Sequence, residues 1–452
     1  MTSKTLFGTN GIRGIVNTDL TPNLIVRLGV ALGTYFGSRN IIVGYDARTS
    51  NDIFAKAITA GLASAGTNVF EVGLAPTPAI QFAVKHFGKD GAVIITASHN
   101  PPEYNGVKVV TDDGIEISRT EEMKIEELFY NERFCYKEWD KLGTISSLSD
   151  ILRPYMDAIK SHVDMSAIGR RHFKIVVDSA NSVGGLVTPR LLSDLGCEVT
   201  TLNAHIDGRF PGRLPEPKPE TLEKLSRTVT ALGADLGIAH DGDADRCLFV
   251  DEKGNVCLGD KTGAIIIDYV LEERPPSIVV TPVSSSRMVE DVVQSRHSTI
   301  RWTKVGSTHV SREMVEHNSI VSMEDNGGIF YAPHQPVRDG AMAAALMLEI
   351  LAKRERPLSE LVALLPTYHI VKERISCPNE CKEKILDELL EMTKSYDRTT
   401  IDGVKVLFDD GSVLIRPSGT EAIYRVYAEA KNEKRAIELA DWGKSMVKQC
   451  TL

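Results

Sequence analysis

Three aspartates at alternate positions, Asp241, Asp243 and Asp245, are the residues with the clearest chemical purpose in this chain. Carboxylates at this spacing repel one another unless a strong positive charge lies between them. A hard divalent cation supplies that charge, because such ions take oxygen ligands. The pattern therefore predicts a metal site, with either Ca²⁺ in a structural loop or Mg²⁺ at a site of phosphoryl transfer.

The sequence around the aspartates favours Mg²⁺. An EF-hand loop needs glycine at its sixth position and glutamate at its twelfth. Glu252 fits the twelfth position, but Arg246 occupies the sixth. The short apolar runs at residues 236–239 and 247–250 predict strands rather than the helices of an EF-hand. Three carboxylates also leave room for water and a phosphate oxygen, which is how proteins usually hold Mg²⁺. A solvated acidic turn without a metal is the remaining alternative.

A serine follows another apolar run, at residues 92–95. Ser98 therefore lies where a buried strand is expected to end, and ligands bind at the carboxyl ends of strands in α/β sheets. An ordinary Ser/Asn turn closed by Pro101 explains the same residues. A Ser-His hydrolase fits less well, because His99 is adjacent and the sequence has neither a Gly-x-Ser-x-Gly elbow nor a Gly-rich oxyanion loop. Lys108, a few residues on, supplies an amine.

Two loops that contain arginine could bind an anion. Residues 416–421 read RPSGTE between two expected strands, and Arg425 lies just beyond them. The arginine fork matches phosphate oxygens, and hydroxyls and backbone amides add further donors. A Pro/Gly-rich hairpin loop explains the turn residues but not the two arginines. Near the N-terminus, Arg13 lies between glycines that let the backbone approach an anion closely.

Other classes of protein fit the sequence poorly. The net charge of −9 argues against nucleic acid or an anionic membrane as the main partner. Seven scattered cysteines do not form a disulfide framework, and no apolar segment is long enough to span a membrane. The N-terminal residues lack the apolar core of a signal peptide, so we expect a cytoplasmic protein. Residues 254–262 nearly spell a P-loop, but Asp260 stands where lysine is required and would repel phosphate.

The elements that position these loops follow one repeated pattern. Residues 92–98, 174–181 and 277–284 each show a short apolar strand, a turn with Ser or Asn, and then a helical pattern. Strands that alternate with amphipathic helices predict α/β domains. From residue 368 the pattern changes to strands and helices of a small α+β domain. The predicted domains are residues 1–150, 151–250, 251–366 and 367–452.

Four loops together resemble the signature loops of the α-D-phosphohexomutases. They are residues 96–101, 241–246, 324–327 and 416–421, and residues 8–14 resemble the N-terminal motif of the family. The order and spacing match the family over the whole chain, and the pattern looks closest to archaeal phosphomannomutase/phosphoglucomutase. The resemblance implies a heart-shaped, four-domain fold, with three related α/β domains and a small α+β C-terminal domain around a central cleft. One loop from each domain would line the cleft.

The resemblance also implies a role for each loop. Ser98 would carry the phosphoserine, and its phosphate oxygen would join Asp241, Asp243 and Asp245 around one Mg²⁺ per chain. The catalytic group would comprise Ser98, His99, Arg13, Lys108 and Arg246, with Lys108 also a candidate general acid/base. Glu324 and Asn326 would bind sugar hydroxyls. The non-reacting phosphate would be held by Arg416, Ser418, Gly419, Thr420 and Arg425.

The activity implied is the interconversion of hexose 1-phosphate and hexose 6-phosphate, with mannose or glucose as the sugar. It would proceed through the phosphoserine and a hexose 1,6-bisphosphate, which is both intermediate and activator. Phosphoglucosamine mutase, with the same mechanism, is the nearest alternative. A metal-dependent sugar phosphatase and an inactive sugar-phosphate-binding protein are further alternatives. The expected partners are hexose phosphates, and we expect a monomer or homodimer.

Two positions depart from the pattern of the family. Gly328 stands where the sugar loop often has histidine, so an acid/base role for that histidine does not transfer to this chain. His309 lies nearby in sequence but out of register, which makes it a weak substitute. Asn10 stands where aspartate is common, and we expect it to be tolerated because the residue shapes the loop.

Overall fold

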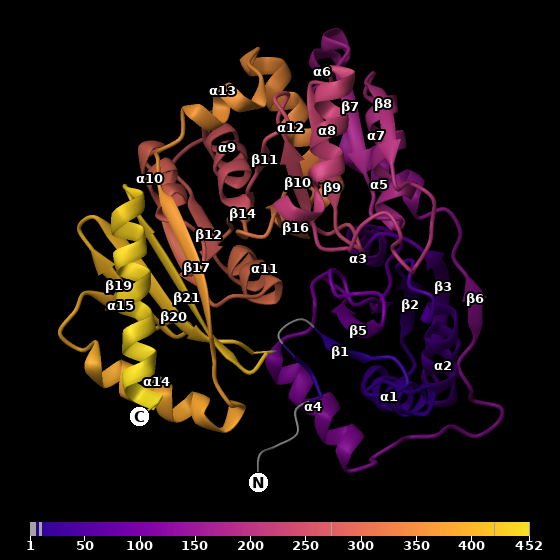
Figure 1. The fold of residues 1–452 in the computed structure, drawn as a ribbon. Coiled ribbons are helices and arrows are strands. Elements are labelled where there is room, and N and C mark those ends of the chain that lie inside the picture. The colour runs from indigo at the N-terminus through magenta and orange to yellow at the C-terminus, as the bar shows by residue number, and fades with distance from the viewer. Residues whose placement is uncertain (1–5, 9–10, 273, 420, 452) are drawn as a thin grey trace. The chain divides into compact units, whose positions relative to one another are not determined.

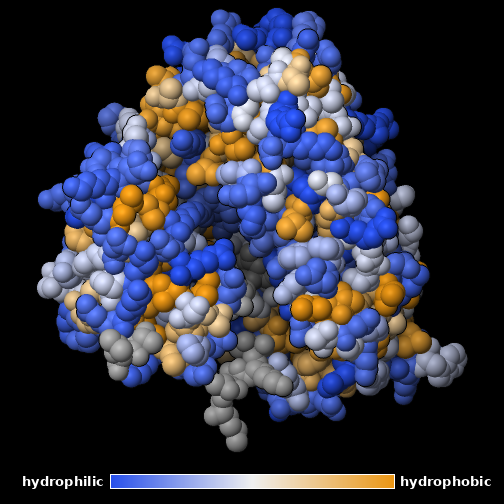
Figure 2. Space-filling view, in the orientation of Figure 1, coloured by the Kyte–Doolittle hydropathy of each residue, from blue (hydrophilic) through white to orange (hydrophobic). Residues whose placement is uncertain are grey.

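The computed structural model describes residues 6–8, 11–272, 274–419 and 421–451 (Figure 1). The chain divides into two compact units: unit 1 comprises residues 1–262 and 326–363, and unit 2 comprises residues 263–325 and 364–452. Across the described part of the chain, no helix is both long and apolar enough to cross a membrane. The face drawn in Figure 2 is mainly hydrophilic, with apolar residues scattered over it.

The first sheet of unit 1 carries the serine loop. Its six strands have the order β1-β5-β4-β2-β3-β6. β2 runs parallel to β3 and to β4, so the residues that follow β2 and β4 emerge at the same edge. The strands are β1 (Ile12–Ile15), β2 (Asn40–Tyr45), β3 (Asn68–Leu74), β4 (Gly91–Ile95), β5 (Tyr104–Thr111) and β6 (Ile145–Ser147). The helices are α1 (Pro22–Phe36), α2 (Asn51–Ser64), α3 (Thr77–His86) and α4 (Arg119–Tyr130).

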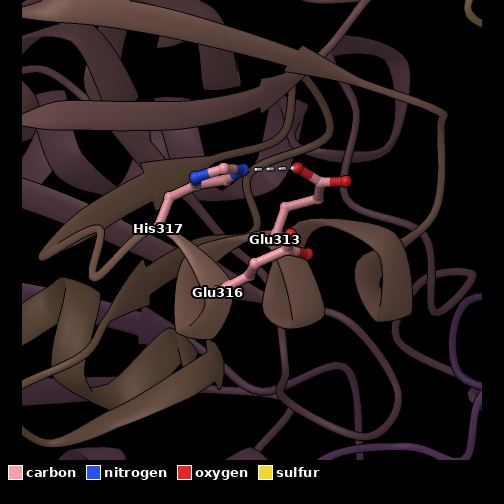
Figure 3. A group of neighbouring side chains, drawn as sticks. All are labelled: Glu313, Glu316 and His317. Carbon is pink, nitrogen blue, oxygen red and sulfur yellow. Dashed lines mark ion pairs between the residues drawn. The ribbon is translucent and has the colours of Figure 1, made fainter.

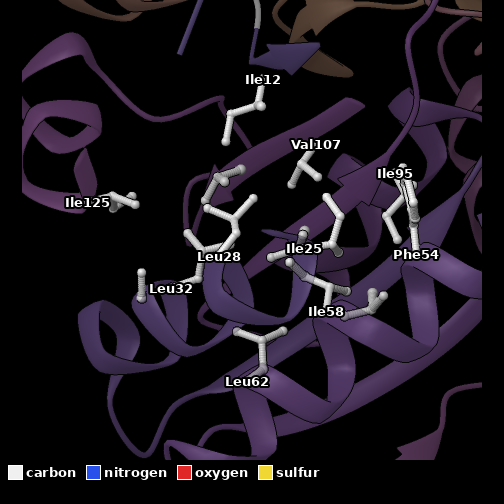
Figure 4. Close-up of a cluster of buried hydrophobic side chains, with 14 of the residues drawn as sticks. Ile12, Ile25, Leu28, Leu32, Phe54, Ile58, Leu62, Ile95, Val107 and Ile125 are labelled. Atoms are coloured by element: carbon white, nitrogen blue, oxygen red, sulfur yellow. The ribbon is translucent and has the colours of Figure 1, made fainter. Parts of the chain in front are cut away.

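A tightly packed hydrophobic core joins α1 and α2 to this sheet (Figure 4). Its fully buried residues include Ile25, Leu28, Ile58, Leu62 and Ile95. Glycine permits the close approach of the two helices, because a Cβ at Gly61 would lie 2.4 Å from the carbonyl oxygen of Val26. The rigid core below the sheet gives the loops at its edge a fixed base.

The second sheet of unit 1 carries the three aspartates. Its strand order is β11-β10-β9-β7-β8, with β7 parallel to both β8 and β9 and with β9 antiparallel to β10. The strands are β7 (Lys174–Asp178), β8 (Glu198–Leu202), β9 (Leu236–His240), β10 (Cys247–Val250) and β11 (Val256–Cys257). The helices are α5 (Leu152–Lys160), α6 (Met165–Arg171), α7 (Thr188–Asp194) and α8 (Glu223–Leu232). Residues 241–246 connect β9 to β10, so the prediction of strands rather than EF-hand helices is confirmed.

The last part of unit 1 is a hairpin followed by two helices. β15 (Ile329–Tyr331) pairs antiparallel with β16 (Gln335–Arg338). Asp339 then caps α12 (Gly340–Arg354), because its carboxylate accepts the amide of Met342 at 2.9 Å. α12 is buried along nearly its whole length, as its apolar sequence predicts, and α13 (Leu358–Ala363) follows.

Unit 2 contains parallel strands and a separate antiparallel sheet. β12 (Ile278–Pro282) runs parallel to β13 (Thr299–Thr303) and to β14 (Val321–Met323). The accompanying helices are α9 (Gly259–Glu272), whose first four residues belong to unit 1, α10 (Arg287–Ser295) and α11 (Ser307–Glu316). The antiparallel sheet has the order β17-β21-β20-β19-β18. Its strands are β17 (His369–Ser376), β18 (Arg398–Thr399), β19 (Val404–Phe408), β20 (Gly411–Pro417) and β21 (Ile423–Ala430), and its helices are α14 (Lys382–Met392) and α15 (Glu433–Thr451).

Candidate active site

Ser98 lies in a tight turn at the end of β4. Its backbone has a φ of 49°, in the left-handed region that few residues other than glycine adopt. The amide of Ser98 donates to Thr96 Oγ1 at 2.8 Å, and its Oγ donates to Asp241 Oδ2 at 2.8 Å. The turn therefore directs the buried serine hydroxyl at the first of the three aspartates.

The structure brings the three aspartates together, as predicted. Asp241, Asp243 and Asp245 are all buried, and each contributes an oxygen to a group whose atoms lie within 4.8 Å of one another. One oxygen of each carboxylate is anchored by a protein donor. Asp241 Oδ1 accepts the amide of Arg246 at 3.2 Å.

The other two anchors come from distant parts of unit 1. Asp243 Oδ2 accepts from Thr77 Oγ1 at 2.7 Å and from Lys108 Nζ at 2.8 Å. Asp245 Oδ2 accepts from Lys108 Nζ at 3.1 Å and from Arg338 Nη2 at 2.6 Å. Sequence reasoning missed Thr77 and Arg338. Thr77 is 166 residues from its partner Asp243. No local sequence motif marks Thr77 or Arg338 as a partner of the aspartates.

The second oxygens of these carboxylates fit a metal ion. Asp243 Oδ1 and Asp245 Oδ1 are buried, and neither has a hydrogen-bond partner among the described residues. Asp241 Oδ2 faces the serine hydroxyl. Burying a carboxylate oxygen without a donor or a cation is costly, and a hard divalent cation takes ligands of this kind. The arrangement therefore suits a metal ion held by the three aspartates beside Ser98.

Charge and burial set the protonation states in this group. Burial raises the pKa of Asp241 well above its usual value, and the adjacent Asp245 and Asp243 raise it further. A bound cation would remove that penalty. Burial alone would lower the pKa of Lys108, but Asp243, Asp245 and Glu116 raise it above its usual value. Lys108 is therefore an ammonium ion, which can donate a proton but cannot accept one.

Further cationic and neutral groups surround the serine turn. Arg13 Nη1 donates to Asn100 Oδ1 at 2.7 Å, whereas its Nη2 is buried without a partner in the described chain. Arg246 Nε lies 3.9 Å from both Asp241 and Asp245. Burial, together with the nearby arginines, lowers the pKa of His99 well below its usual value, so its ring is neutral. These donors are placed to receive an anion beside Ser98.

The predicted sugar loop follows β14. Glu324 is buried at 2% exposure and belongs to unit 2. Asn326 belongs to unit 1, and its Oδ1 accepts the amide of Gly328 at 3.1 Å. His309 lies in the first turn of α11 in unit 2, where burial lowers its pKa.

The predicted phosphate loop joins β20 and β21 in unit 2. Arg416 and Arg425 are directly opposite each other on these strands, where like charges are unfavourable unless negative groups balance them. Arg416 Nη2 pairs with Asp402 at 2.9 Å, and Arg425 Nη2 pairs with Glu421 at 2.5 Å.

The two arginines and the loop between them offer guanidinium, hydroxyl and backbone groups. The Nε atoms of Arg416 and Arg425 are buried without a hydrogen-bond partner in the described part of unit 2. Ser418 is buried, and its Oγ accepts the amide of Glu421 at 3.2 Å. Gly419 is exposed, and Thr420 lies outside the described residues.

A second group of potential metal ligands lies on α11 (Figure 3). Glu313, Glu316 and His317 share one helix face because of their spacing. Glu313 Oε2 already accepts from Arg301 Nε at 3.0 Å and lies 3.2 Å from His317 Nε2. All three side chains reach the surface at least in part, so the group is an ordinary surface ion-pair cluster.

Comparison with known proteins gives matches along most of the chain. Family models for the domains of phosphoglucomutase/phosphomannomutase match in chain order. They are alpha/beta/alpha domain I at residues 4–135, domain II at 153–254, domain III at 258–368 and the C-terminal domain at 374–441.

Individual relatives match over nearly their full length. A phosphoglucosamine/phosphogalactosamine mutase of Sulfurisphaera tokodaii is 45% identical over 449 residues, which is 98% of this chain and 99% of that protein. A phosphoglucomutase/phosphomannomutase of Thermococcus kodakarensis is 42% identical over 451 residues, 98% of each chain. The crystal structure of a phosphoglucomutase/phosphomannomutase family protein from Burkholderia thailandensis superposes with a TM-score of 0.89 at 28% identity, covering 100% of this chain and 98% of that one.

Proposed function

The chain belongs to the phosphoglucomutase/phosphomannomutase family, and we propose that it is a phosphohexomutase that interconverts hexose 1-phosphate and hexose 6-phosphate. The observation that carries the proposal is the Ser98 hydroxyl, 2.8 Å from Asp241, in a group of three buried aspartates. A hydroxyl in this position can carry a phosphoryl group and return it.

The proposed reaction consists of two phosphoryl transfers, each of a different phosphoryl group. In the first transfer, the bond between Ser98 Oγ and phosphorus breaks as a sugar hydroxyl oxygen bonds to phosphorus, and the hydroxyl proton leaves to a base. The product is a hexose 1,6-bisphosphate. In the second transfer, Ser98 Oγ gives up its proton and bonds to the other phosphorus as the bond between that phosphorus and its sugar oxygen breaks. The sugar oxygen takes up a proton, and the isomeric monophosphate remains. Such transfers depend mainly on positioning and on neutralising charge on the phosphoryl oxygens.

The residues of unit 1 have separate tasks in this proposal. Asp241, Asp243 and Asp245, with an oxygen of the Ser98 phosphate, would hold Mg²⁺, which neutralises phosphoryl charge when bound. Arg13, Arg246 and the Lys108 ammonium would add positive charge around the same phosphoryl group. Because Lys108 holds two of the aspartates, we propose that it donates protons and orients these carboxylates rather than acting as the first base. His99 Nδ1 lies 3.4 Å from Ser98 Oγ, and burial lowers the pKa of its ring well below the usual value, so we propose that His99 contacts the Ser98 group as a neutral ring.

The remaining predicted residues would bind the substrate. Arg416 and Arg425 would grip the non-reacting phosphate with Ser418, Gly419 and Thr420. Their opposed guanidinium groups and buried Nε atoms support this assignment. Glu324 and Asn326 would bind sugar hydroxyls. We also propose that a hexose 1,6-bisphosphate activates the enzyme. We further propose that the enzyme works in the cytoplasm as a monomer or homodimer.

We propose mannose and glucose phosphates as the substrates, with glucosamine phosphate as the second candidate. The second candidate is supported by the Sulfurisphaera tokodaii relative, whose name is phosphoglucosamine/phosphogalactosamine mutase. The Thermococcus kodakarensis relative, named phosphoglucomutase/phosphomannomutase, supports the first at a similar identity of 42%. The carboxylate of Glu324 and the amide of Asn326 can each bind a hydroxyl or an amine, so they do not separate the two sugars.

The test uses purified protein with Mg²⁺ and a trace of glucose 1,6-bisphosphate. Glucose, mannose and glucosamine 1-phosphates are supplied separately, and ³¹P NMR follows the conversion to 6-phosphates and the release of inorganic phosphate. We expect isomer formation from glucose and mannose phosphates without accumulation of inorganic phosphate. A preference for glucosamine phosphate of about two orders of magnitude in kcat/KM would establish the second candidate. Steady release of phosphate without isomer would identify a phosphatase.

A further inference from the structure

Arg48 lies beneath the serine loop and does not belong to any of the loops described above. It follows β2, whose end lies at the same sheet edge as the end of β4. Its side chain is fully buried and pairs with the fully buried Asp46, with Arg48 Nε at 3.2 Å from Asp46 Oδ2. A buried arginine in this position needs enough hydrogen-bond acceptors to replace the water molecules that it loses on burial.

Arg48 finds those acceptors in the backbone of the serine loop. Nη2 donates to the carbonyl oxygens of Ser98 at 2.9 Å and Asn100 at 2.6 Å. Nη1 donates to the carbonyl oxygens of Pro101 at 2.6 Å and Tyr104 at 2.8 Å. A guanidinium has five N–H groups, so these contacts and the Asp46 contact use all of them.

The same ion pair also reaches the amide of Ser98. Asp46 Oδ2 accepts from Thr96 Oγ1 at 2.6 Å, and Thr96 Oγ1 accepts the Ser98 amide at 2.8 Å. Both peptide groups of Ser98 are therefore tied to the Asp46–Arg48 pair, one through Thr96 and one directly. A residue at a φ of 49° needs such restraint, because an L-residue other than glycine is strained there.

We propose that Arg48 is a positioning residue for phosphoryl transfer at Ser98, an inference that rests on the proposed function. Arg48 acts in two ways. It fixes the turn that aims Ser98 Oγ at Asp241. It also turns four carbonyl oxygens towards a guanidinium and so away from the phosphoryl group, whose negative charge they would repel.

A neighbouring turn closes over Arg48. The ring of Phe210 covers the guanidinium, with 5.2 Å between Arg48 Cζ and the ring centroid. Gly208, in the same turn, packs closely against the backbone next to Arg48, since a Cβ there would be 2.2 Å from the carbonyl oxygen of Ala47. Phe210 is buried at 4% exposure. Water is thereby kept from competing for the carbonyls that Arg48 holds.

An equivalent pair supports the aspartate loop. Asp178 ends β7, and Arg213 Nε lies 3.0 Å from its Oδ1. Arg213 Nη2 donates to the carbonyl oxygen of His240 at 2.6 Å, directly before Asp241. The two loops that carry Ser98 and Asp241 are thus each held by a buried Asp–Arg pair at a sheet edge.

Lysine cannot replace Arg48 in this arrangement. An ammonium group offers three donors from one point, whereas the guanidinium fork reaches acceptors on two sides. Arg48→Lys keeps the charge beside Asp46 but loses at least two of the carbonyl contacts. Arg48→Met loses the charge as well. Thr96→Val keeps Arg48 and removes only the link between Asp46 and the Ser98 amide.

The experiment compares these variants with Leu62→Ala, which opens a cavity in the core of the same sheet without touching the loop. Each protein is assayed at the same interval below its own melting temperature. The readouts are kcat, KM and the fraction of Ser98 phosphorylated after treatment with glucose 1,6-bisphosphate, measured by intact mass.

We expect kcat to fall ~100-fold in Arg48→Lys, while KM stays within about threefold. Phosphorylation of Ser98 should be correspondingly slow. Thr96→Val should lose ~10-fold in kcat, and Leu62→Ala should stay within about threefold of wild type.

The inference is overturned if wild type interconverts hexose phosphates and Arg48→Lys keeps kcat within threefold. It is also overturned if Leu62→Ala loses as much kcat as Arg48→Lys at an equal loss of stability. If the Arg48 variants do not fold, Thr96→Val decides the matter, and wild-type kcat in that variant overturns the inference. Failure of wild type itself to form isomer would instead refute the proposed function.

Discussion

Thr77→Val tests whether the donors behind the aspartates tune metal binding. The substitution keeps the shape of the side chain and removes the hydrogen bond from Thr77 Oγ1 to Asp243 Oδ2, which is 2.7 Å long. Both residues are buried and the acceptor is charged, so this bond is worth about 2 kcal/mol to the folded protein. Loss of a donor behind a metal ligand typically weakens metal affinity 10–100-fold. We expect the lower end, ~10-fold, because Lys108 still holds the same oxygen at 2.8 Å.

The assay is a titration of mutase activity with Mg²⁺ at saturating substrate, together with thermal unfolding in EDTA. The matched control is Thr59→Val, another buried threonine of unit 1, whose Oγ1 donates to Glu71 at 3.3 Å. Thr77→Val should raise the Mg²⁺ activation constant and recover much of its activity at high Mg²⁺. Thr59→Val should leave that constant unchanged. Activation constants within twofold of wild type in both variants would refute the reasoning.

Three further outcomes are expected. Ser98→Ala should lower mutase kcat ~10³-fold or more while hexose-phosphate binding, measured by calorimetry, survives; an active variant would contradict the phosphoserine role. Arg416→Ala should raise KM for hexose phosphates more than it lowers kcat, because gripping the non-reacting phosphate is largely uniform binding; an effect on kcat alone in steady-state kinetics would contradict this. Burial raises the pKa of Glu122 to about 7, so this carboxyl favours folding below pH ~4.5 and loses that contribution as pH rises through about 7. Glu122→Gln should therefore melt at a higher temperature than wild type at pH 8 but not at pH 4, and an equal shift at both values would argue against it.

Much of the architecture could be predicted from the sequence because short apolar runs mark buried strands. The runs at residues 236–239 and 247–250 correspond to β9 and β10, and the run at 92–95 corresponds to β4. Membership of the family and the four-domain α/β architecture are confirmed by matches along the chain.

The candidate site could be predicted only where its chemistry is local in sequence. Three aspartates at alternate positions predict a metal site, because their charges repel one another without a cation. The partners of these aspartates are not predicted in this way, because Thr77 and Arg338 meet them only after the chain has folded, across 166 and 93 residues. No sequence motif predicts the contacts of Arg48 either, because its acceptors are backbone carbonyls, which every residue type supplies. The roles of the site residues, the domain boundaries and the central cleft stay predictions.

The ion pair between Arg416 and Asp402 has a consequence for how anions are discriminated. Asp402 also accepts the amide of Val305 at 3.1 Å, so its carboxylate is held in place from two sides. An anion that binds Arg416, as we propose for the substrate phosphate, would have to exchange with this internal counter-ion. A doubly charged monoester would gain more from that exchange than chloride would, because its charge is higher. We therefore expect the pair of Arg416 and Asp402 to favour doubly charged anions over singly charged ones.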